Sequence, residues 1–467
     1  MMDRQAQLLF LYGAPASGKS TLAAWLAKIP GIQAADLDEE IARSAGRSIP
    51  AIFQEDGEPA FRALERNTLQ RLIAEKRPGL RVIALGGGTL LDPANRRLCE
   101  EAGTVVCLET PSAQELAARI QQADGTRPLG DRAIERATHY ASFPNRLART
   151  FRLNDSLVLV GRGLASPFLI SFPAVFDDTV ARLYPHLAGH SLATIPSGEQ
   201  YKTPDTVMAL WEEFGHFGLG RHDCVAACGG GVSGDLTGFA AATWMRGMPW
   251  INIPTTLLAM VDASTGGKTG CDLPAGKNLV GAFHSPQLVV IDVDFLQTLP
   301  DRELRSGRAE MIKHSIIGHG TPTVEPPLPT GLPTAAEIAT SLAVKVDIIR
   351  QDPLETTGKR LLLNCGHTVG HAVETASHYR LSHGEAVAIG CVEEARMAEK
   401  RNLAPAGWAD SLVRHFQAAG LPVAIPREIS QDRLVDLMKM DKKKQAGSVV
   451  FALPCGWGDV RATEIAL

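Results

Sequence analysis

The stretch Leu8-Leu-Phe-Leu-Tyr-Gly-Ala-Pro-Ala-Ser-Gly-Lys-Ser-Thr21 decides the fold, because an apolar run leads directly into a glycine-containing loop. The run from Leu8 to Tyr12 is far too short to span a membrane and is typical of a buried strand. The loop has the spacing Gly-x4-Gly-Lys-Ser/Thr, and an amphipathic helical pattern follows it. A strand, a phosphate-type loop and a helix in this order predict an α/β fold with a parallel sheet.

The loop residues Gly13, Gly18, Lys19, Ser20 and Thr21 are those expected to bind a nucleotide. Glycines let backbone N–H groups turn toward phosphate at the start of a helix, where the helix dipole also favours an anion. A lysine at this place reaches the β- and γ-phosphates, and the hydroxyl after it can ligate Mg²⁺. We therefore expect ATP and magnesium here. A tight turn with a stray lysine is the alternative, and the strand and helix on either side argue against it.

Short apolar strand candidates alternate with helical patterns along the first 300 residues or so. Besides Leu8 to Tyr12, they lie at 81–85, 105–109, 157–160, 224–227 and 288–291. Later in the chain, helical stretches with few strand candidates follow at 361–376, 385–400 and 409–418. The proline-rich tract 320–333 predicts a loop. We expect a P-loop domain with a parallel sheet at 1–154, a second α/β domain at 155–300 and a mainly helical domain at 301–467.

Composition limits the class of protein. A chain of 467 residues is about three times the length of a ~150-residue domain, so two or three domains are expected. The formal net charge of −4 gives no general attraction to nucleic acid or to an acidic membrane, so small molecules are the expected partners. The eight cysteines include no Cys-x-x-Cys pair, which argues against a disulfide framework and favours a cytoplasmic location.

Several weaker signals follow the phosphate-type loop. They are Asp36-Leu-Asp38, Phe61-Arg62, the triple glycine 86–88 and Arg127-Pro-Leu. Each alone is common in loops and at solvent-facing positions. Together they offer a carboxylate on the metal side, a base for a hydroxyl group and guanidinium groups for a carboxylate. Phosphoryl transfer to a small hydroxy acid needs this combination.

Residues 8 to about 153 resemble shikimate kinase through these motifs, together with Gly57-Glu58 and the segment Arg136-Ala-Thr-His-Tyr140. The resemblance implies that Ser20 binds Mg²⁺ and that Arg127 covers the ATP phosphates from a lid. It places shikimate on four residues, with Asp38 as the base: Asp38, Arg62, Gly87 and Arg136. Two departures stand out. Only eight residues separate Arg127 from Arg136, and the family's closing helix is missing after Asn154.

Histidines are concentrated late in the chain, at His314, His319, His367, His371, His378 and His383. His367 and His371 are four apart on one face of a predicted helix, and His383 opens the next helix. No glutamate follows His367, which excludes a metalloprotease His-Glu-x-x-His motif. Glu310 adds an oxygen ligand, so three protein ligands would leave one position open for a substrate hydroxyl. Spacing alone leaves His367 and His371 as alternatives, and buried histidines bonded to backbone remain a structural explanation.

A second glycine-rich turn, Gly229-Gly-Gly-Val-Ser-Gly-Asp235, lies between an apolar strand and a helix-compatible run. Its glycines would admit a pyrophosphate at a helix start, although an ordinary tight turn is equally compatible with them. Basic residues follow in apolar or glycine-rich stretches, at Arg246, Lys268, Lys277 and Lys313. Charge is unusual in such surroundings, and a phosphorylated substrate would explain it.

Residues from about 157 to 467 resemble 3-dehydroquinate synthase. The matching motifs are Ser197-Gly-Glu-Gln-Tyr-Lys-Thr203, Gly229 to Asp235 with the residues that follow, Pro254-Thr-Thr-Leu-Leu-Ala-Met-Val-Asp262, Leu273-Pro-Ala-Gly-Lys-Asn278 and Leu363-Asn-Cys-Gly-His-Thr-Val-Gly-His371. The resemblance implies zinc, or another divalent ion, on Glu310, His367 and His383, with His371 in the reaction site. It also implies transient oxidation by NAD at C4 of the substrate, loss of phosphate, re-reduction, ring opening and an aldol closure.

The same resemblance assigns the remaining site residues. For NAD it implies Asp177, Glu199, Lys202, Gly231 to Asp235, Thr255, Thr256, Asp262, Lys268, Lys277 and the turn from Phe295 to Thr298. Around the substrate it implies Lys268, Lys277, Asn278, Lys313, Arg360, Asn364 and Lys442. Arg246 would grip the substrate phosphate across a homodimer interface formed by the synthase part.

The sequence thus predicts a bifunctional enzyme of the shikimate pathway. The kinase would make shikimate 3-phosphate, and the synthase would make 3-dehydroquinate from 3-deoxy-D-arabino-heptulosonate 7-phosphate. These steps are not consecutive, so direct transfer of a product between the sites is not implied. Two alternatives remain: the first half is a nucleotide-binding regulatory module, or the second half is a zinc-dependent polyol dehydrogenase. The acceptor-side residues argue against the first, and the cluster of basic residues against the second.

No flexible linker separates Phe151-Arg-Leu-Asn154 from Asp155-Ser-Leu-Val-Leu-Val-Gly161. A junction without slack predicts a fixed interface in which the synthase replaces the missing kinase helix. After a cut near Asn154, we expect residues 155–467 to stay folded and active. Residues 1–154 would be poorly soluble or lose affinity for the nucleotide.

Overall fold

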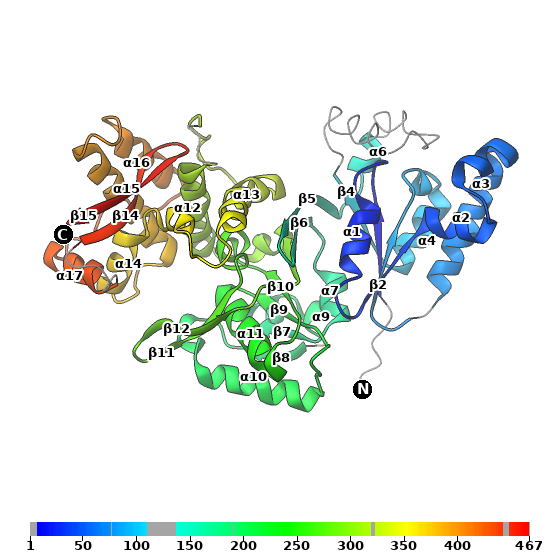
Figure 1. Cartoon of the computed structure of the whole chain (residues 1–467), viewed down its shortest axis with the longest axis horizontal. Helices are drawn as coiled ribbons and strands as arrows, with labels where there is room; N and C mark the ends of the chain where they lie inside the picture. Colours follow the sequence, from blue (N-terminus) through cyan, green and yellow to red (C-terminus); the bar gives the residue numbers. More distant parts are fainter. Residues whose placement is uncertain are drawn as a thin grey trace.

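The computed structural model describes residues 7–75, 77–109, 137–189, 191–318, 323–441 and 448–466. Figure 1 shows an elongated molecule with the N-terminal part at one end and the C-terminal helices at the other. Arg127, Arg136 and Lys442, which the sequence placed in the sites, lie outside the described residues.

The N-terminal part is a parallel sheet flanked by helices, as the strand–loop–helix pattern predicted. Its elements are β1 (Gln7–Tyr12), α1 (Lys19–Leu26), β2 (Ile32–Asp36), α2 (Leu37–Ala45), α3 (Ile49–Ala74), β3 (Leu80–Ala84), α4 (Pro93–Ala102), β4 (Thr104–Leu108), α6 (Ala137–Ala141) and β5 (Arg146–Leu153). The strands lie in the order β2-β3-β1-β4-β5, and each pairs in parallel with its neighbours in this set.

The second part is also a parallel sheet with helices. Its strands are β6 (Ser156–Arg162), β7 (Ala174–Asp177), β8 (Ser191–Ile195), β9 (Val225–Gly229), β10 (Trp250–Pro254) and β13 (Leu288–Asp292). The main helices are α7 (Ser166–Ser171), α8 (Asp178–Leu183), α10 (Pro204–Phe217) and α11 (Gly231–Thr243). A separate antiparallel ribbon, β11 (Lys268–Leu273) with β12 (Gly276–Phe283), projects from this part toward the left in Figure 1.

The two parts form one sheet of 11 strands, in the order β2-β3-β1-β4-β5-β6-β13-β10-β9-β7-β8. The join is an antiparallel hairpin in which β5 and β6 pair from Arg146 with Arg162 to Leu153 with Ser156. Asn154 lies in the turn with a φ of 48°, a left-handed conformation that asparagine tolerates better than most residues. The fixed interface expected from the missing linker is therefore present.

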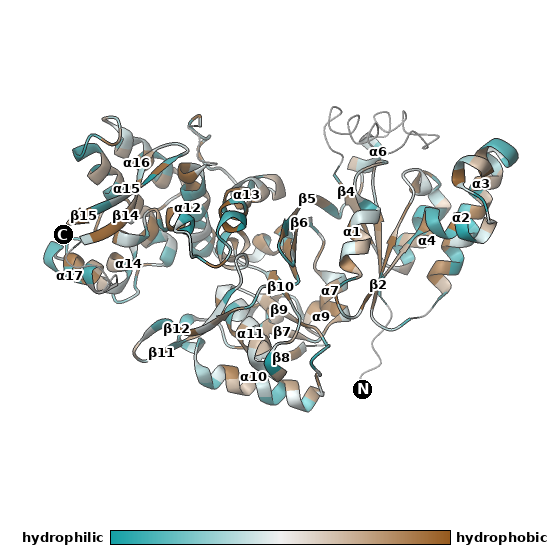
Figure 2. Cartoon of the chain, viewed as in Figure 1, coloured by the Kyte–Doolittle hydropathy of each residue, from teal (hydrophilic) through white to brown (hydrophobic). Residues whose placement is uncertain are grey.

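One hydrophobic core continues across this join. Leu9 and Leu26 from the N-terminal part, Phe151 from β5, and Val158 and Ile349 from the rest of the chain belong to the same buried cluster. Figure 2 shows apolar residues along the sheet strands and hydrophilic residues on outlying helices such as α2 and α17. A cut near Asn154 would therefore expose apolar surface on both fragments. The expectation that residues 155–467 stay folded and active on their own did not consider this surface.

Helix α13 (Ala335–Gln351) adds a second connection. Its buried residues Leu342, Val346 and Ile349 belong to the shared core, and Arg350 Nε donates to the carbonyl of Arg152 on β5 at 2.9 Å. The helix starts with a capping box between Thr334 and Glu337. A helix of the C-terminal part therefore packs directly on a strand of the N-terminal part.

The C-terminal part is mainly helical, as predicted, with two corrections. Its elements are α12 (Asp301–Ile317), α13, η7 (Lys359–Asn364), α14 (His367–Ala376), α15 (His383–Lys400), α16 (Trp408–Ala418), α17 (Gln431–Asp441), β14 (Ser448–Gly456) and β15 (Asp459–Ala466). The single helix predicted at 361–376 is wrong, because the chain turns sharply between η7 and α14. The paucity of strands is also wrong at the end of the chain, where β14 and β15 form a hairpin.

Gly366 explains the break before α14. Its φ is +75°, and a Cβ there would lie 2.3 Å from Cys391 Sγ on α15. Only glycine combines this backbone conformation with so close an approach. The turn directs His367 toward α12 and α15 rather than along the preceding helix.

Among the described residues, no helix has the length and apolar character needed to cross a membrane. All eight cysteines are buried and free, in agreement with the absence of a disulfide framework.

We predict that the two halves unfold together. Replacement of Phe151, which is 6% exposed on β5, by alanine should lower the free energy of unfolding by about 3–5 kcal/mol, because it opens a cavity in the shared core. During heating, the two activities expected from the sequence should be lost in Phe151→Ala at the same, lower temperature. Thr150→Ala changes an exposed neighbour on the same strand and is the control. Loss of only one activity would contradict a common core.

Candidate active sites

The phosphate-type loop connects β1 to α1 at an end of the sheet. Gly13 and Gly18 have φ values of 139° and 97°, a region that favours glycine. Lys19 is buried, and its Nζ donates to the carbonyls of Gly13 at 3.0 Å and Ala14 at 2.7 Å. Thr21 is exposed on α1. The lysine charge is thus held beneath a loop whose N–H groups lie at a helix start, an arrangement suited to a nucleotide phosphate.

Ser20 lies beside the end of β2. Its Oγ donates to Asp36 Oδ2 at 2.5 Å, and Asp36 Oδ1 accepts from the backbone N–H groups of Asp38 and Glu39 as the cap of α2. Asp36 therefore brings a carboxylate to the hydroxyl expected to bind Mg²⁺. The pair of aspartates separates into one on the metal side, Asp36, and one exposed residue, Asp38.

The acceptor-side residues gather where β3 ends. A Cβ at Gly86 would lie 3.1 Å from Asp38 Oδ1 and 3.4 Å from Glu65 Oε1, so both carboxylates approach the same turn. Arg62 Nη1 forms an ion pair with Glu65 Oε2 at 2.8 Å. Arg62 keeps its charge here, because the nearby carboxylates raise its pKa although burial opposes this. A cation and a carboxylate are thus placed near the phosphate-type loop.

Gly87 connects this turn to the phosphate-type loop. A Cβ at Gly87 would lie 2.9 Å from Pro15 Cδ, so the two backbones are in close contact. The Gly87 carbonyl accepts from the Tyr140 hydroxyl at 2.9 Å and from the Tyr12 hydroxyl at 3.2 Å. The phosphate-type loop, the triple glycine and the two aspartates therefore lie close together at this end of the sheet.

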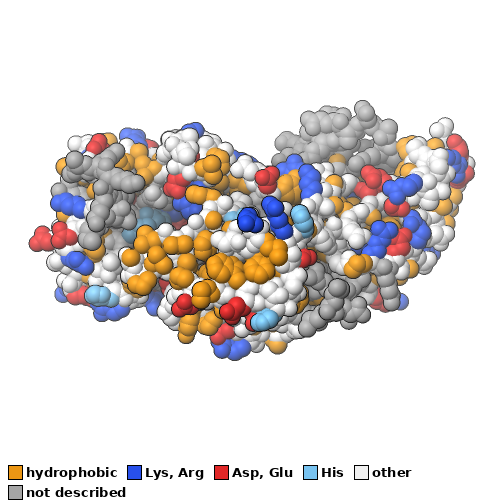
Figure 3. All heavy atoms as spheres, turned by 60° about the horizontal axis from the view of Figure 1, so that its bottom comes forward, with side chains coloured by type: hydrophobic (Ala, Val, Ile, Leu, Met, Phe, Trp, Pro, Cys, Tyr) orange, Lys and Arg blue, Asp and Glu red, His pale blue; other side chains and the backbone are white. Residues whose placement is uncertain are grey.

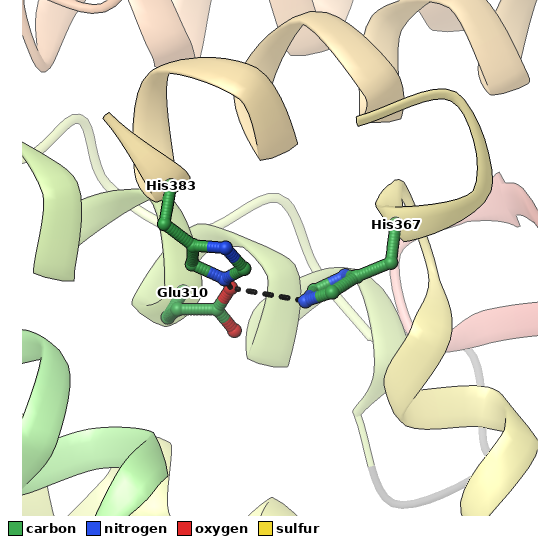
Figure 4. A group of neighbouring side chains, drawn as sticks. All are labelled: Glu310, His367 and His383. Carbon is green, nitrogen blue, oxygen red and sulfur yellow. Dashed lines mark ion pairs between the residues drawn. The ribbon is translucent and has the colours of Figure 1, made fainter. Parts of the chain in front are cut away.

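The second site is built by three helices of the C-terminal part. Glu310 from α12, His367 from α14 and His383 from α15 each offer a ligand atom, and these atoms all lie within 4.8 Å of one another. Glu310 Oε1 is 3.3 Å from His383 Nε2 and 3.6 Å from His367 Nε2. Figure 4 shows both imidazoles directed at the Glu310 carboxylate. His371 is exposed next to His367, with ring centroids 5.2 Å apart.

These three residues have the character of metal ligands. Glu310 is fully buried, its Oε2 pairs with Lys313 Nζ, and its Oε1 faces both imidazoles. His367 Nδ1 faces the Cys365 carbonyl at 3.1 Å, and His383 Nδ1 faces Glu374 Oε2 at 3.6 Å. In both imidazoles the remaining nitrogen is thus left for a metal, and two nitrogens with one oxygen suit Zn²⁺.

Two buried lysines lie beside Glu310. Lys313 Nζ pairs with Glu310 Oε2, and Lys345 Nζ lies 2.6 Å from Asp262 Oδ1. The Lys345 and Lys313 charges hold the pKa of Asp262 well below its usual range although burial opposes this. His314 Nδ1 forms a hydrogen bond with Ser341 Oγ at 2.8 Å. Burial and the Lys313 charge lower the pKa of His314 to about 4. The buried lysines and carboxylates therefore pair with one another directly beside the candidate metal ligands.

The glycine-rich turn after β9 lies against the end of β7. A Cβ at Gly229 would lie 2.9 Å from Asp177 Cβ, and one at Gly231 would lie 3.4 Å from Ala263 Cβ. Asp177 Oδ1 accepts from the N–H of Thr179 at 2.9 Å. The turn, Asp177 and the segment after β10 therefore meet at one end of the sheet, where α/β folds commonly bind nucleotides.

Lys202 bridges the turn and the β11–β12 ribbon. Its Nζ is 2.7 Å from Asp235 Oδ2 on α11 and 2.7 Å from Asn278 Oδ1 on β12. Burial raises the pKa of Asp235, and Asp235 in turn raises the pKa of Lys202 despite the burial of the lysine. Lys277, beside Asn278, forms an ion pair with Glu199 at 3.3 Å.

Other residues assigned to NAD lie around the same edge. Thr255 is buried and its N–H donates to the Gly229 carbonyl at 2.9 Å, while Thr256 lies against Gly230. Phe295 and Thr298 belong to η6 (Val293–Thr298), and Thr298 Oγ1 is 2.8 Å from the Tyr184 hydroxyl. The residues expected at the cofactor are thus distributed over neighbouring strand ends.

Basic residues from both sides of the synthase part face each other. Lys268 Nζ on β11 is 2.6 Å from Glu355 Oε2, and the Arg360 guanidinium packs against Gly266, where a Cβ would lie 2.6 Å from Nη2. Asn364 ends η7, directly before the metal ligands. Arg246 differs from the others, because it is exposed on a left-handed turn with a φ of 66°.

Comparison with known proteins identifies the two halves. Residues 15–158 match the shikimate kinase family, 192–306 match the 3-dehydroquinate synthase N-terminal family, and 307–444 match the 3-dehydroquinate synthase C-terminal family. A 3-dehydroquinate synthase of Synechococcus sp. is 46% identical over 282 residues, which cover 58% of this chain and 76% of that protein. The chain belongs to the 3-dehydroquinate synthase family.

Solved structures agree with this membership. A 2-deoxy-scyllo-inosose synthase, solved with carbaglucose-6-phosphate, NAD⁺ and Co²⁺, superposes with a TM-score of 0.60 at 25% identity, covering 68% of this chain and 97% of that one. A 2-epi-5-epi-valiolone synthase of Streptomyces hygroscopicus, solved with NAD⁺ and Zn²⁺, gives 0.58 at 29% identity and covers 68% and 95%.

The chain therefore combines a shikimate kinase domain with the 3-dehydroquinate synthase domains, and the predicted pair of shikimate-pathway activities is confirmed at the level of the domains. The kinase match extends past the boundary expected at 154 and into β6, the strand that pairs with β5.

Sequence reasoning missed several residues that build the synthase site. Among these, Lys345 has the clearest signal in the sequence. It interrupts the apolar face of α13 between Leu342 and Ile349, and a lysine at such a position needs a buried partner. Glu374 and Glu394 carry no comparable signal. Their importance depends on which helices pack together, and a single sequence does not show that.

Glu394 holds the start of α14. This buried residue of α15 accepts from the N–H of Gly366 at 2.7 Å and of Val369 at 3.1 Å, on either side of His367. We predict that Glu394→Gln lowers the free energy of unfolding by about 1–3 kcal/mol, because charged acceptors are lost from buried donors. Urea denaturation measures the change.

Glu393→Gln is the matched control on the same helix, since Glu393 is partly exposed and pairs with Arg396. Its effect should stay below about 1 kcal/mol. Equal losses of unfolding free energy in the two variants would show that the contacts of Glu394 with α14 do not stabilise the protein more than an exposed ion pair does.

Proposed function

We propose that the N-terminal domain phosphorylates shikimate with ATP and Mg²⁺ through the residues grouped at the ends of β1, β2 and β3. Lys19 would stabilise the charge that develops on the transferring phosphoryl group. Ser20, with Asp36 beside it, would hold Mg²⁺. Asp38 would accept the proton of the shikimate hydroxyl, and Arg62 would bind the shikimate carboxylate. The close approach of the Asp38 carboxylate to the triple glycine supports this arrangement.

We infer that the C-terminal part converts 3-deoxy-D-arabino-heptulosonate 7-phosphate to 3-dehydroquinate, with Glu310, His367 and His383 as zinc ligands. The convergence of these three side chains beside two buried lysines carries the proposal. Bound zinc would polarise the substrate hydroxyl at C4, and NAD would supply reversible oxidation there. A simple polyol dehydrogenase would have no phosphate to bind, and the basic residues Lys268, Lys277 and Arg360 argue against it.

The protein's own residues would bind the substrate and move its protons. Lys313 and Lys345 are buried and pair with Glu310 and Asp262, so they would hold these two carboxylates in place beside the substrate. The remaining polar residues would bind the substrate: Lys268, Lys277, Asn278, Arg360 and Asn364. His371, which is exposed next to His367, would exchange a proton with the departing phosphate. Asp352 fixes the Arg360 backbone, because it accepts from the Arg360 N–H at 3.2 Å.

NAD would lie along the strand ends at Asp177, the Gly229–Gly231 turn and Thr255, with Lys202 and Asp235 closing the site. The position of Gly231 at the start of α11 supports this, because backbone N–H groups at a helix start favour a phosphate. We propose three domains at 1–154, 155–300 and 301–467, of which the first two share a sheet. The buried free cysteines support a cytoplasmic location.

We also propose a homodimer formed through the β11–β12 ribbon and its surroundings. Leu279, Val280 and Phe283 of β12 are 60%, 38% and 52% exposed, and Met245 beside Arg246 is 50% exposed. Figure 3 shows a broad apolar patch on the face that carries β11, β12 and α10. A second copy covering this patch would remove it from water and bring the exposed Arg246 to the partner's substrate.

The two sites should be separable by substitution. His367→Ala should remove about one equivalent of zinc and abolish synthase turnover while leaving phosphorylation of shikimate intact, because the sites use different residues. Elemental analysis and separate assays of the two activities measure this.

Lys19→Ala is the reciprocal control. It should lower kinase turnover by about a hundredfold or more and leave zinc content and synthase turnover unchanged. Undiminished zinc in His367→Ala would overturn the ligand assignment, and full turnover in Asp38→Asn would overturn the base assignment.

The dimer is tested by Leu279→Asp, which should yield a monomer in light scattering, since a charge in a buried apolar contact costs more than the contact contributes. Synthase turnover should fall with it, because Arg246 would no longer reach the other copy. Leu183→Asp changes another half-exposed leucine, on α8, and is the control. A monomeric unsubstituted protein with full turnover would contradict the proposal.

A further inference from the structure

Glu374 lies on the opposite side of the His383 ring from Glu310. His383 Nε2 faces Glu310 Oε1 at 3.3 Å, and His383 Nδ1 faces Glu374 Oε2 at 3.6 Å. The side chain of Glu374 is only 14% exposed on α14, the helix that begins with His367. The imidazole is therefore flanked by one carboxylate at each nitrogen.

The second oxygen of Glu374 is also engaged. Glu374 Oε1 is 3.5 Å from Lys277 Nζ, and the lysine lies 4.3 Å from the centre of the Tyr379 ring. Lys277 belongs to β12, so this contact links the helical part to the ribbon of the second part. With one oxygen toward a cation and the other toward an imidazole, the carboxylate has a single preferred orientation.

The two candidate histidine ligands are held differently. His367 Nδ1 faces a backbone carbonyl, that of Cys365, at 3.1 Å. His383 Nδ1 faces a side chain, which a substitution can remove. A histidine that binds a metal through one nitrogen normally donates its other N–H to such an acceptor, and this fixes the tautomer and the ring orientation and makes the ligand nitrogen more basic.

We propose that Glu374 is a positioning residue for the metal site: it accepts the Nδ1–H of His383, and Lys277 holds it in place. His383 then presents Nε2 without a proton toward Glu310. The inference rests on the zinc site proposed above and adds to it a residue that has no contact with the metal itself. It also connects Lys277, which is expected at the cofactor and substrate, to the proposed zinc ligand His383 through a single intervening residue, Glu374.

Metal affinity tests this directly. Full-length protein freed of metal is titrated with Zn²⁺ and with Co²⁺ against a competing chelator. Glu374→Ala should weaken binding by about 10–100-fold, the usual effect of losing such a partner, and should change the visible absorption of bound Co²⁺. Glu374→Gln should weaken it less, because the amide oxygen still accepts the N–H but carries no charge.

Glu428→Gln is the matched control, since Glu428 is a nearby exposed glutamate that pairs with Arg380. It should leave the affinity and the Co²⁺ spectrum unchanged. Thermal unfolding of the metal-free variants separates a misfolded protein from a weakened site, and Glu374→Gln decides the matter if Glu374→Ala fails to fold. Unchanged affinity and spectrum in the Glu374 variants would overturn this inference alone. An unsubstituted protein that binds no metal would overturn the zinc site as well.

Discussion

The structure depends on the antiparallel pairing of β5 with β6. This hairpin turns two parallel sheets into one sheet of 11 strands and closes the edge that each sheet would otherwise expose. It also explains how the kinase domain is stabilised although the closing helix of the shikimate kinase family is missing after Asn154. The hairpin and α13 cover the apolar side of β5 instead, and the core that results belongs to both halves.

A second constraint acts inside the synthase part, where charged groups are buried together. Glu310, Lys313 and His314 are all nearly or fully inaccessible, and Lys345 pairs with Asp262 close by. Removing such groups from water is costly unless each finds a partner, so the site is held together by mutual neutralisation. A metal between Glu310 and the two histidines would add to this balance. The geometry required for chemistry and the geometry required for burial are thus the same.

How much could be predicted from the sequence depended on whether the signal was local. The phosphate-type loop, the glycine turn after β9 and the apolar strands of the first two domains follow from neighbouring residues, and the structure has them where the patterns placed them. The break at Gly366 was missed, because its cause is the approach of Cys391, which is distant in sequence. The strands β14 and β15 were missed for a related reason. Each is stabilised by pairing with the other, and this pairing is not a feature of either segment alone.

The candidate metal site shows the same division. The types and spacing of Glu310, His367 and His383 indicated metal binding, but the residues alone left His367 and His371 as alternatives, and only the direction of the rings brings His367 to the carboxylate. Asp36 was recognised as one of two aspartates, but its contact with Ser20 depends on how β2 lies beside the loop. Supporting residues such as Glu374 act through packing between helices, and nothing in their immediate sequence marks them.

The reversal of chain direction between β5 and β6 also determines where the two sites lie on the sheet. Every strand on the kinase side runs opposite to every strand of the main sheet on the synthase side, so the carboxyl ends of the two sets lie at opposite edges. The phosphate-type loop follows β1 and the glycine turn follows β9, so the two sets of strand-end residues belong to opposite edges of the shared sheet. The two reactions are not consecutive, so neither site needs to receive the product of the other. Covalent fusion here ensures equal amounts of two catalysts and a common stability, while each exchanges its substrates with the surrounding solution.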